Sequence, residues 1–245
     1  MRIKIILESI VDKNIVLPIH YNHLMQAFIY HNISNELAIF LHNHGFEYEK
    51  RRFKLFVFSR IFAKKAQFYD GKAFFDRQIY FYLSSPLDNF ISQFAEHILK
   101  RNHVSIFGNM VAIKEIYVLP EPEFKEEHVI KMLSPVTVYS TLLKGTKKKT
   151  YYYSPVEKEF SMLIKENLGK KYFSFYEESL NFIFEMKPEK VNKNLEKIVI
   201  YKNTVIKGWL GTYTICSCPE IIKFAYHTGL GAKNSQGFGM FDICS

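Results

Sequence analysis

Five histidines lie within the first 44 residues, and four of them, His20, His23, His42 and His44, are candidates for chemistry. An imidazole can bind a metal ion, and it can transfer protons near neutral pH. No carboxylate or cysteine completes a recognised ligand spacing around the four histidines, and the zinc motif H-E-x-x-H is absent. The three cysteines of the chain form no C-x-x-C pair. We therefore expect no metal and no other cofactor, and the histidines favour proton transfer.

His42 stands near the end of a short helix that the sequence predicts over residues 34–45. Ser34 is a typical N-cap residue, and Gly45 is a typical helix stop. The unpaired carbonyl groups of a last helical turn favour an imidazolium, which suits His42 for proton transfer near neutral pH. The alternative is that His42 only caps the helix.

A second candidate site is the glycine-rich segment GLGAKNSQGFG over residues 229–239, which holds four of the 11 glycines of the chain. A Walker loop would need G-x-x-x-x-G-K-[ST], but Phe238 follows Gly237. The dinucleotide motif G-x-G-x-x-G would need a glycine in place of Asn234. The RNA-recognition-motif signature agrees only at the glycines and the first aromatic residue. The segment is therefore either a tight turn or a backbone surface that contacts a ligand.

Charge and composition favour a polynucleotide partner. The chain has 33 Lys and Arg against 24 Asp and Glu, a formal net charge of +9, and 16% aromatic residues among 245. Cations attract phosphates, and aromatic rings stack on unpaired bases. No apolar run reaches the length of about 18 residues that a membrane span needs, and the first residues alternate like a strand rather than a signal peptide. We therefore expect a cytoplasmic protein with no membrane partner.

The elements that would position these residues occur in the same order twice. A segment rich in proline and glutamate at residues 119–127 cannot easily continue a strand, and it divides the chain. Periodicity predicts β-α-β-β-α-β in the first half, at residues 2–8, 22–33, 54–60, 77–83, 86–101 and 111–119. The second half repeats this order, at residues 129–141, 155–167, 181–187, 197–215, 219–227 and 237–243. We predict an α+β fold of two tandem ferredoxin-like domains, similar to RNA-recognition motifs, over residues 1–120 and 121–245.

This duplicated frame coincides with three segments, LSPV at residues 133–136, PVEKEF at residues 155–160, and the glycine-rich loop before the last strand. Together they resemble the CRISPR-associated repeat-processing endoribonucleases, the sixth numbered Cas family within the RAMP superfamily. The resemblance runs from Met1 to about Ile243. It implies that the protein cuts CRISPR precursor RNA inside each repeat, without a metal, to give guide RNA.

The resemblance also implies catalytic residues in the N-terminal domain: Tyr30, His42 and Lys54 match the family's tyrosine, histidine and lysine positions. The 2′-hydroxyl of the RNA would be the nucleophile, His42 would transfer protons, Tyr30 would position or share that transfer, and Lys54 would supply positive charge. The products would carry a 5′-hydroxyl and a 2′,3′-cyclic phosphate or 3′-phosphate. Which of Tyr30 and His42 is the acid or the base stays open, as does a register in which His44 replaces His42.

The periodicity of residues 22–33 places Tyr30 opposite the apolar face, which predicts an exposed side chain, and Lys54 begins a predicted strand. An ordinary surface tyrosine and a solvated lysine are the alternatives to their catalytic roles.

Three segments are expected to bind RNA. The glycine-rich loop would let backbone N–H groups approach phosphates, through Gly229, Gly231, Lys233, Asn234, Ser235, Gly237 and Gly239. A predicted hairpin over residues 143–153 has a basic tip, formed by Lys147, Lys148 and Lys149. Arg51 and Arg52 add charge beside Lys54. A purely structural turn and a solvated loop are the alternatives for the first two segments.

The alternative function is a RAMP subunit without catalytic activity that binds guide RNA within a CRISPR effector complex. CRISPR repeat RNA is the expected partner in both cases, subunits of an effector complex are further candidates, and a homodimer is left open.

Overall fold

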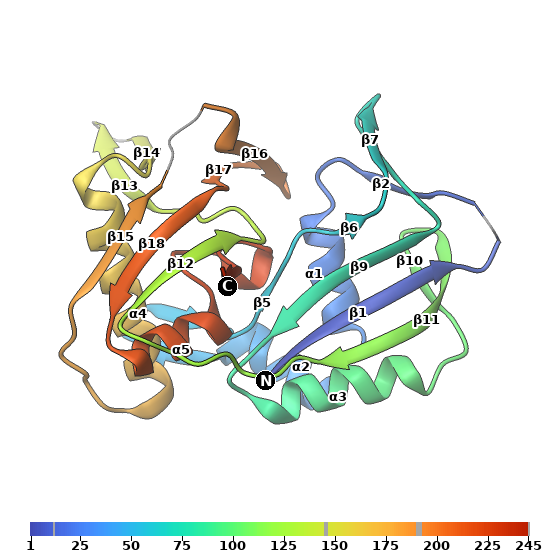
Figure 1. Cartoon of the computed structure of the whole chain (residues 1–245), viewed down its shortest axis with the longest axis horizontal. Coiled ribbons are helices and arrows are strands. Elements are labelled where there is room, and N and C mark those ends of the chain that lie inside the picture. The colour runs from blue at the N-terminus through green and yellow to red at the C-terminus, as the bar shows by residue number, and fades with distance from the viewer. Residues whose placement is uncertain (12, 145–146, 190–192, 245) are drawn as a thin grey trace.

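The chain forms two lobes that lie side by side, each with one antiparallel sheet and helices on one face (Figure 1). The computed structural model describes residues 1–11, 13–144, 147–189 and 193–244, without the side chains of residues 143–144, 147–148 and 193. The fold is therefore mixed α+β, as the sequence predicted.

The first sheet has the order β10-β11-β1-β9-β5, and β6 also pairs with β9. These strands are β1 (Arg2–Ser9), β5 (Val57–Phe58), β6 (Phe62–Ala63), β9 (Gln78–Ser84), β10 (Val104–Ile106) and β11 (Asn109–Val118). Alternation in β1 buries Ile3, Ile5 and Leu7 on one face, as expected for a sheet with one covered face. The two central strands, β1 and β9, are thus the first and third of a β-α-β-β-α-β path.

Two helices cover the buried face of this sheet, α1 (Asn22–Tyr30) and α3 (Asp88–Leu99). Their apolar stripes meet the strands in a core of aliphatic and phenylalanine side chains. Shorter elements extend the lobe: the helix α2 (Asn35–Ile39), the π-helical turn η1 (Phe40–His44) and the strands β2 (Ile15–Pro18), β7 (Ala66–Tyr69) and β8 (Lys72–Phe75). The hairpin of β3 (Phe46–Tyr48) and β4 (Arg51–Phe53) reaches the second lobe, where Phe46 and Phe53 pack against the core.

The second sheet has the order β15-β18-β12-β19. Its strands are β12 (Glu127–Met132), β15 (Phe184–Pro188), β18 (Thr212–Ser217) and β19 (Phe241–Ile243), and its helices are α4 (Lys158–Tyr176) and α5 (Pro219–Thr228). Two hairpins complete the lobe, β13 (Tyr139–Lys144) with β14 (Lys147–Tyr152) and β16 (Glu196–Tyr201) with β17 (Thr204–Trp209). The first and third strands are again central, so both lobes follow the same path. The domain boundary at residue 120 stays a prediction.

Four predicted elements differ from the observed ones. The strand expected over residues 129–141 is two strands of different sheets, β12, which ends at Met132, and β13, which begins at Tyr139. The strand expected at residues 54–60 contains only Val57 and Phe58, because Leu55 has φ +51°, outside the β region. The helix expected to end at residue 167 continues to Tyr176. The strand expected over residues 197–215 is three strands, broken first at Lys202 and Asn203, which both have positive φ.

Arg2 of β1 joins the two lobes. Its buried guanidinium donates hydrogen bonds to the carbonyl oxygens of Phe241, at 2.8 Å, and Tyr226, and it lies 3.2 Å from the centroid of the Tyr226 ring. Asp242 lies 3.5 Å from it. Burial lowers the pKa of Arg2 to about 10, so the guanidinium stays charged at neutral pH. Because these partners belong to α5 and β19, one side chain fixes the second lobe against the first.

No helix within the described parts of the chain is both long enough and apolar enough to cross a membrane.

Candidate active site

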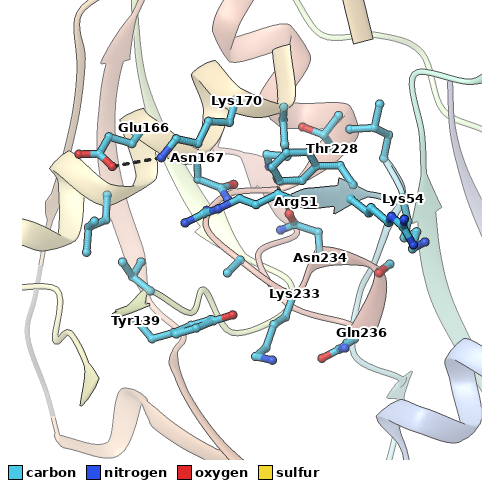
Figure 2. Close-up of a pocket in the computed structure, with 18 of the residues that line it drawn as sticks. Arg51, Lys54, Tyr139, Glu166, Asn167, Lys170, Thr228, Lys233, Asn234 and Gln236 are labelled. Carbon is cyan, nitrogen blue, oxygen red and sulfur yellow. Dashed lines mark hydrogen bonds and ion pairs between the residues drawn. The ribbon is translucent and has the colours of Figure 1, made fainter. Parts of the chain in front are cut away.

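A cleft of about 540 Å³ lies where the two lobes meet, and Figure 2 shows the side chains around it. Its walls come from four places: β4 and the chain after it, the start of β13, one face of α4, and the glycine-rich loop. The lining residues are Arg51–Phe56, Val138, Tyr139, Thr141, Leu163, Glu166, Asn167, Lys170, Lys171, Thr228 and residues 232–236. Residues more than 180 positions apart in the sequence therefore line the same cleft.

The cleft is strongly basic. Its cations are Arg51, Arg52, Lys54, Lys170, Lys171 and Lys233. Glu166 is the one carboxylate among the lining residues, and Lys170 pairs with it at 3.5 Å, as the dashed line in Figure 2 marks. A concave surface lined by positive charges raises the local concentration of an anionic ligand. The arrangement thus suits a phosphate chain.

The two candidate histidines lie on the π-helical turn that follows α2. Ser34 caps α2 by accepting a hydrogen bond from the Leu37 N–H at 3.3 Å, which confirms the predicted N-cap. Gly45 ends the turn with φ +67°, and its N–H donates to the Phe40 carbonyl at 2.8 Å. His42 and His44 are both exposed on this turn. Such π turns are frequent at functional sites.

Lys54 and His42 are in direct contact. The Lys54 ammonium donates a hydrogen bond to the His42 carbonyl oxygen at 2.9 Å, and the His42 Nδ1 lies 2.8 Å from the Asn43 Oδ1. Burial, together with the charge of Arg52, lowers the pKa of Lys54. Lys54 lies after the end of β4 rather than in the predicted strand. This contact joins the Lys54 ammonium to the backbone of the turn that carries His42, twelve residues earlier in the sequence.

Arg52 supports this turn. Its guanidinium donates to the Asn43 carbonyl oxygen at 2.7 Å and pairs with Glu47 at 3.0 Å. Arg51 is exposed and lines the cleft. Arg52 therefore stabilises the π turn through these contacts, and no such contact is described for Arg51.

Tyr30, the last residue of α1, is half-buried, which differs from the exposed position predicted for it. Its ring packs edge-on against Phe56, with the ring centroids 5.8 Å apart. The chain after β4 crosses the helix end at this point, a tertiary contact that helical periodicity does not reveal. Burial, and to a smaller extent Tyr201, raises the pKa of the Tyr30 phenol. Tyr30 is therefore a neutral hydroxyl at ordinary pH.

Only two of the three predicted catalytic residues are thus joined by a described contact. His42 and Lys54 meet directly. Tyr30 touches neither of them by a described contact, although its partner Phe56 lines the same cleft as Lys54.

The glycines of the loop are packed against protein atoms. Gly229, Gly231, Gly237 and Gly239 are buried and have φ between +66° and +83°. A Cβ on Gly231 would lie 2.5 Å from the Thr137 carbonyl oxygen, and a Cβ on Gly237 would lie 2.6 Å from the Phe58 ring. The fold alone therefore requires glycine at these positions, and their approach to phosphates stays a prediction.

The tip of the loop is more open. Residues 232–236 are half-buried, and the backbone N–H groups of Lys233, Asn234 and Ser235 have no hydrogen-bond partner within the described chain. Two side chains of α1 hold this tip from the first lobe: Asn22 donates to the Gln236 carbonyl at 2.8 Å, and Gln26 donates to the Ser235 carbonyl at 2.6 Å. The loop is thus fixed while three donors remain available.

Burial lowers the pKa of Lys233, whose ammonium lies 5.3 Å from the centroid of the Tyr139 ring. Lys233 adopts the left-handed conformation, with φ +61°. Figure 2 shows Lys233 and Tyr139 along one side of the cleft.

Two groups of cleft residues were missed from the sequence. Lys171 of α4 is 2% exposed, and its Nζ donates to the Gly229 carbonyl oxygen and, at 3.2 Å, to the Asn234 Oδ1. Burial lowers the pKa of Lys171 to about 7. Asn167 and Lys170 lie on the same face of α4. The only signal was the i, i+4 spacing of polar residues on a helix that was predicted too short.

The basic hairpin forms as predicted, from β13 and β14. Lys149 is exposed. The side chains of Lys147 and Lys148, like the whole of residues 145–146, lie outside the described residues, so their predicted contact with RNA is untested. Among the side chains that are described, no group of three or more His, Cys, Asp or Glu is arranged to hold a metal ion.

Comparison with known proteins gives one family. The family described as "CRISPR associated protein Cas6, C-terminal" matches residues 119–243, and "CRISPR-associated protein Cas6, N-terminal" matches residues 16–117. The CRISPR-associated endoribonuclease Cas6 1 of Methanocaldococcus jannaschii is 31% identical over 98% of this chain and 91% of that protein. The CRISPR-associated endoribonuclease Cas6 of Pyrococcus furiosus is 29% identical over 95% of this chain and 86% of that protein.

A solved structure of a Cas6-related gene product from Pyrococcus furiosus superposes with a TM-score of 0.87 at 25% identity, covering 100% of this chain and 98% of that one. Sequence and structure agree along the whole length, and the chain belongs to the Cas6 family of CRISPR-associated endoribonucleases.

Proposed function

We propose that this protein cuts CRISPR precursor RNA inside its repeats, with the RNA's own 2′-hydroxyl as the nucleophile. The 2′-oxygen bonds to phosphorus and the bond from phosphorus to the 5′-oxygen breaks. One product then ends in a 2′,3′-cyclic phosphate, which can open to a 3′-phosphate, and the other begins with a 5′-hydroxyl. The 2′-hydroxyl loses a proton and the 5′-oxygen gains one, so the site must transfer protons and stabilise negative charge. No metal is required by this scheme.

The observation that carries this proposal is the contact between Lys54 and His42 beside a basic cleft in a Cas6-family chain. The exposed His42 ring is free to take the proton of a 2′-hydroxyl. The Lys54 ammonium is bonded to the His42 carbonyl oxygen and would offset the charge that develops on the phosphate oxygens. This bond ties Lys54 to the turn that carries His42 before the RNA arrives, which would favour catalysis by orientation.

Tyr30 is assigned the acid side of the reaction. A phenol with an ordinary pKa near 10 is already protonated at neutral pH. Burial raises the pKa of Tyr30 further, so its neutral hydroxyl would donate a hydrogen bond to the 5′-oxygen rather than act as a base. This leaves His42 as the base. The assignment requires the RNA backbone to span the space between the helix end at Tyr30 and the π turn.

The rest of the cleft would hold the RNA. The free N–H groups of residues 233–235 and the ammonium of Lys233 would bind phosphates near the cut, and Arg51 would extend that track. The two lobes would be the tandem ferredoxin-like domains of such an enzyme, with the catalytic residues in the first and the glycine-rich loop in the second.

The test is cleavage of the host's CRISPR repeat RNA in excess chelator, comparing His42→Ala with His44→Ala. The two histidines are matched, because both are exposed and lie on the same π turn. We expect His42→Ala to lose about 10²–10⁴-fold in cleavage rate, the usual contribution of general acid–base catalysis, while its affinity for the RNA is retained. His44→Ala should cut like the wild type.

Other outcomes have distinct meanings. Loss in His44→Ala alone would move the catalytic histidine by two positions and keep the reaction. A wild type that cuts only after Mg²⁺ is added would overturn the metal-independent mechanism. Cleavage of RNA with a 2′-deoxy nucleotide before the cut would show that water is the nucleophile. A wild type that binds repeat RNA tightly without cutting it would favour the non-catalytic guide-binding subunit.

A further inference from the structure

Two faces of helix α4 make different contacts. One is apolar and packs on the second sheet, through Phe160, Ile164, Leu168 and Tyr172. The other lines the cleft, through Leu163, Glu166, Asn167, Lys170 and Lys171. The second set follows the i, i+3, i+4, i+7, i+8 spacing of one helical face. Four of its five residues are polar, so this wall is built for a polar ligand.

The side-chain amide of Asn167 has no partner. Asn167 is 9% exposed, its Oδ1 is buried without a hydrogen bond, and no described residue bonds to its Nδ2. The Oε1 of Gln236, on the glycine-rich loop, is likewise buried without a partner, and both residues line the cleft. Buried polar atoms in native proteins nearly always have a partner, and exceptions call for a functional explanation. Two such acceptors in one cleft point to a ligand that brings N–H donors.

Two neighbouring polar residues bond elsewhere. Lys171, one turn after Asn167, spends its N–H groups on the Gly229 carbonyl and the Asn234 Oδ1. The Asn234 Nδ2 donates to the carbonyls of Leu230 and Phe238, each at 3.0 Å. Lys171 and Asn234 therefore act as positioning residues, which hold the loop against α4, and neither of them bonds to the Asn167 amide.

The chemistry of RNA decides which part of it can reach this amide. Phosphates offer only acceptors, so they suit the lysines and arginines of the cleft and leave an amide oxygen unsatisfied. A ribose 2′-hydroxyl can donate one hydrogen bond to an amide oxygen, but it does not match the amide oxygen and N–H group together. Bases offer N–H groups, and asparagine and glutamine pair with a base that presents an amino group beside a ring nitrogen. Tyr139, across the same cleft, is a half-buried aromatic ring of the kind on which unpaired bases stack.

We infer that Asn167 and the adjoining part of the cleft bind one unpaired amino base of the RNA, adenine or cytosine, by its amino group and ring nitrogen. The inference rests on the proposed function, since it takes the ligand to be repeat RNA. It assigns sequence selection to α4, while the cations bind any RNA chain.

The test measures binding of repeat RNA made uncleavable by a 2′-deoxy nucleotide before the cut. Each adenosine is replaced in turn by purine riboside and each cytidine by 2-pyrimidinone riboside, which removes only the amino group. For the wild type, we expect one position at which this change weakens binding by about tenfold, the scale of one bidentate base contact. Asn167→Leu should bind the unmodified RNA about tenfold more weakly and should no longer respond to the change at that position.

Asn181→Leu is the matched control, because Asn181 is exposed and lies outside the cleft lining, and it should keep the wild-type profile. If Asn167→Leu fails to fold, Asn167→Ala is measured in the same way. The inference is overturned if no amino group matters, or if the response persists in the Asn167 variant. A protein that shows this response but never cuts cleavable RNA would refute the proposed reaction and leave the base site standing.

Discussion

Alanine at Gly239 should destabilise this protein far more than alanine at Gly108. The two glycines have almost the same positive φ, +81° at Gly239 and +80° at Gly108. An added Cβ at Gly108 meets nothing within 4 Å, whereas at Gly239 it would overlap the carbonyl oxygen of Leu230. The pair therefore separates the effect of a positive φ from the effect of filled space.

The expected magnitudes follow from the contacts. A left-handed alanine costs about 1–2 kcal/mol at either site. At Gly239 the Leu230 backbone must also move, which disturbs its N–H bond to the Gly239 carbonyl, at 2.8 Å, and its carbonyl bond from Asn234, at 3.0 Å. Each such bond contributes about 1 kcal/mol, and overpacking a tight region costs about 1–3 kcal/mol. We expect the free energy of unfolding of Gly239→Ala to fall about 3 kcal/mol further than that of Gly108→Ala.

Urea denaturation followed by circular dichroism measures both variants, and RNA binding is measured on the folded proteins. Equal losses of stability would show that the loop does not pack against Leu230 as described. If Gly239→Ala is as stable as Gly108→Ala and yet binds RNA more weakly, the glycine serves the approach of RNA rather than the fold.

Three further results are expected. Since Lys171 titrates near 10.5 when unfolded and at about 7 when folded, the unfolded state holds the extra proton between these values, so stability should rise with pH there. Denaturation at several pH values should show this rise, at most about 1.4 kcal/mol per pH unit, in the wild type relative to Lys171→Met. Tyr30→Phe keeps the ring contact with Phe56 and should unfold like the wild type while cutting RNA more slowly; an unchanged rate would remove Tyr30 from the mechanism. Lys233→Ala should lower the slope of log affinity against log salt by about one phosphate contact, and an unchanged slope would place Lys233 outside the RNA path.

Much of the fold follows from local patterns. Alternation in residues 2–8 predicted β1, and the cap at Ser34 and the stop at Gly45 set the limits of the segment that carries His42. Both predicted helix ends are local events, one a side-chain hydrogen bond and one a positive φ. These features need no knowledge of the rest of the chain.

Other features depend on distant contacts. The helix predicted to end at residue 167 continues through Gly169 to Tyr176, and Leu168 and Tyr172 in this extension are buried in the core of the second lobe. Leu55 takes φ +51° and buries its side chain in the second lobe, which ends the predicted strand. In both places tertiary packing overrides the local preference.

The candidate site also combines residues that the sequence identifies with residues that only tertiary contacts reveal. His42 and Lys54 are twelve residues apart and joined by one hydrogen bond, so a motif could identify them. Asn167 and Lys171 look in sequence like ordinary polar residues of an exposed helix. The glycine-rich loop contacts Lys171 at Gly229 and Asn234, which lie 58 and 63 residues later in the sequence. The burial of the Asn167 amide and of Lys171 can be recognised only in the folded structure. A buried polar group without a partner destabilises the fold unless a ligand supplies the partner. The residues proposed for catalysis could therefore be named from sequence, and the residues proposed to select the base could not.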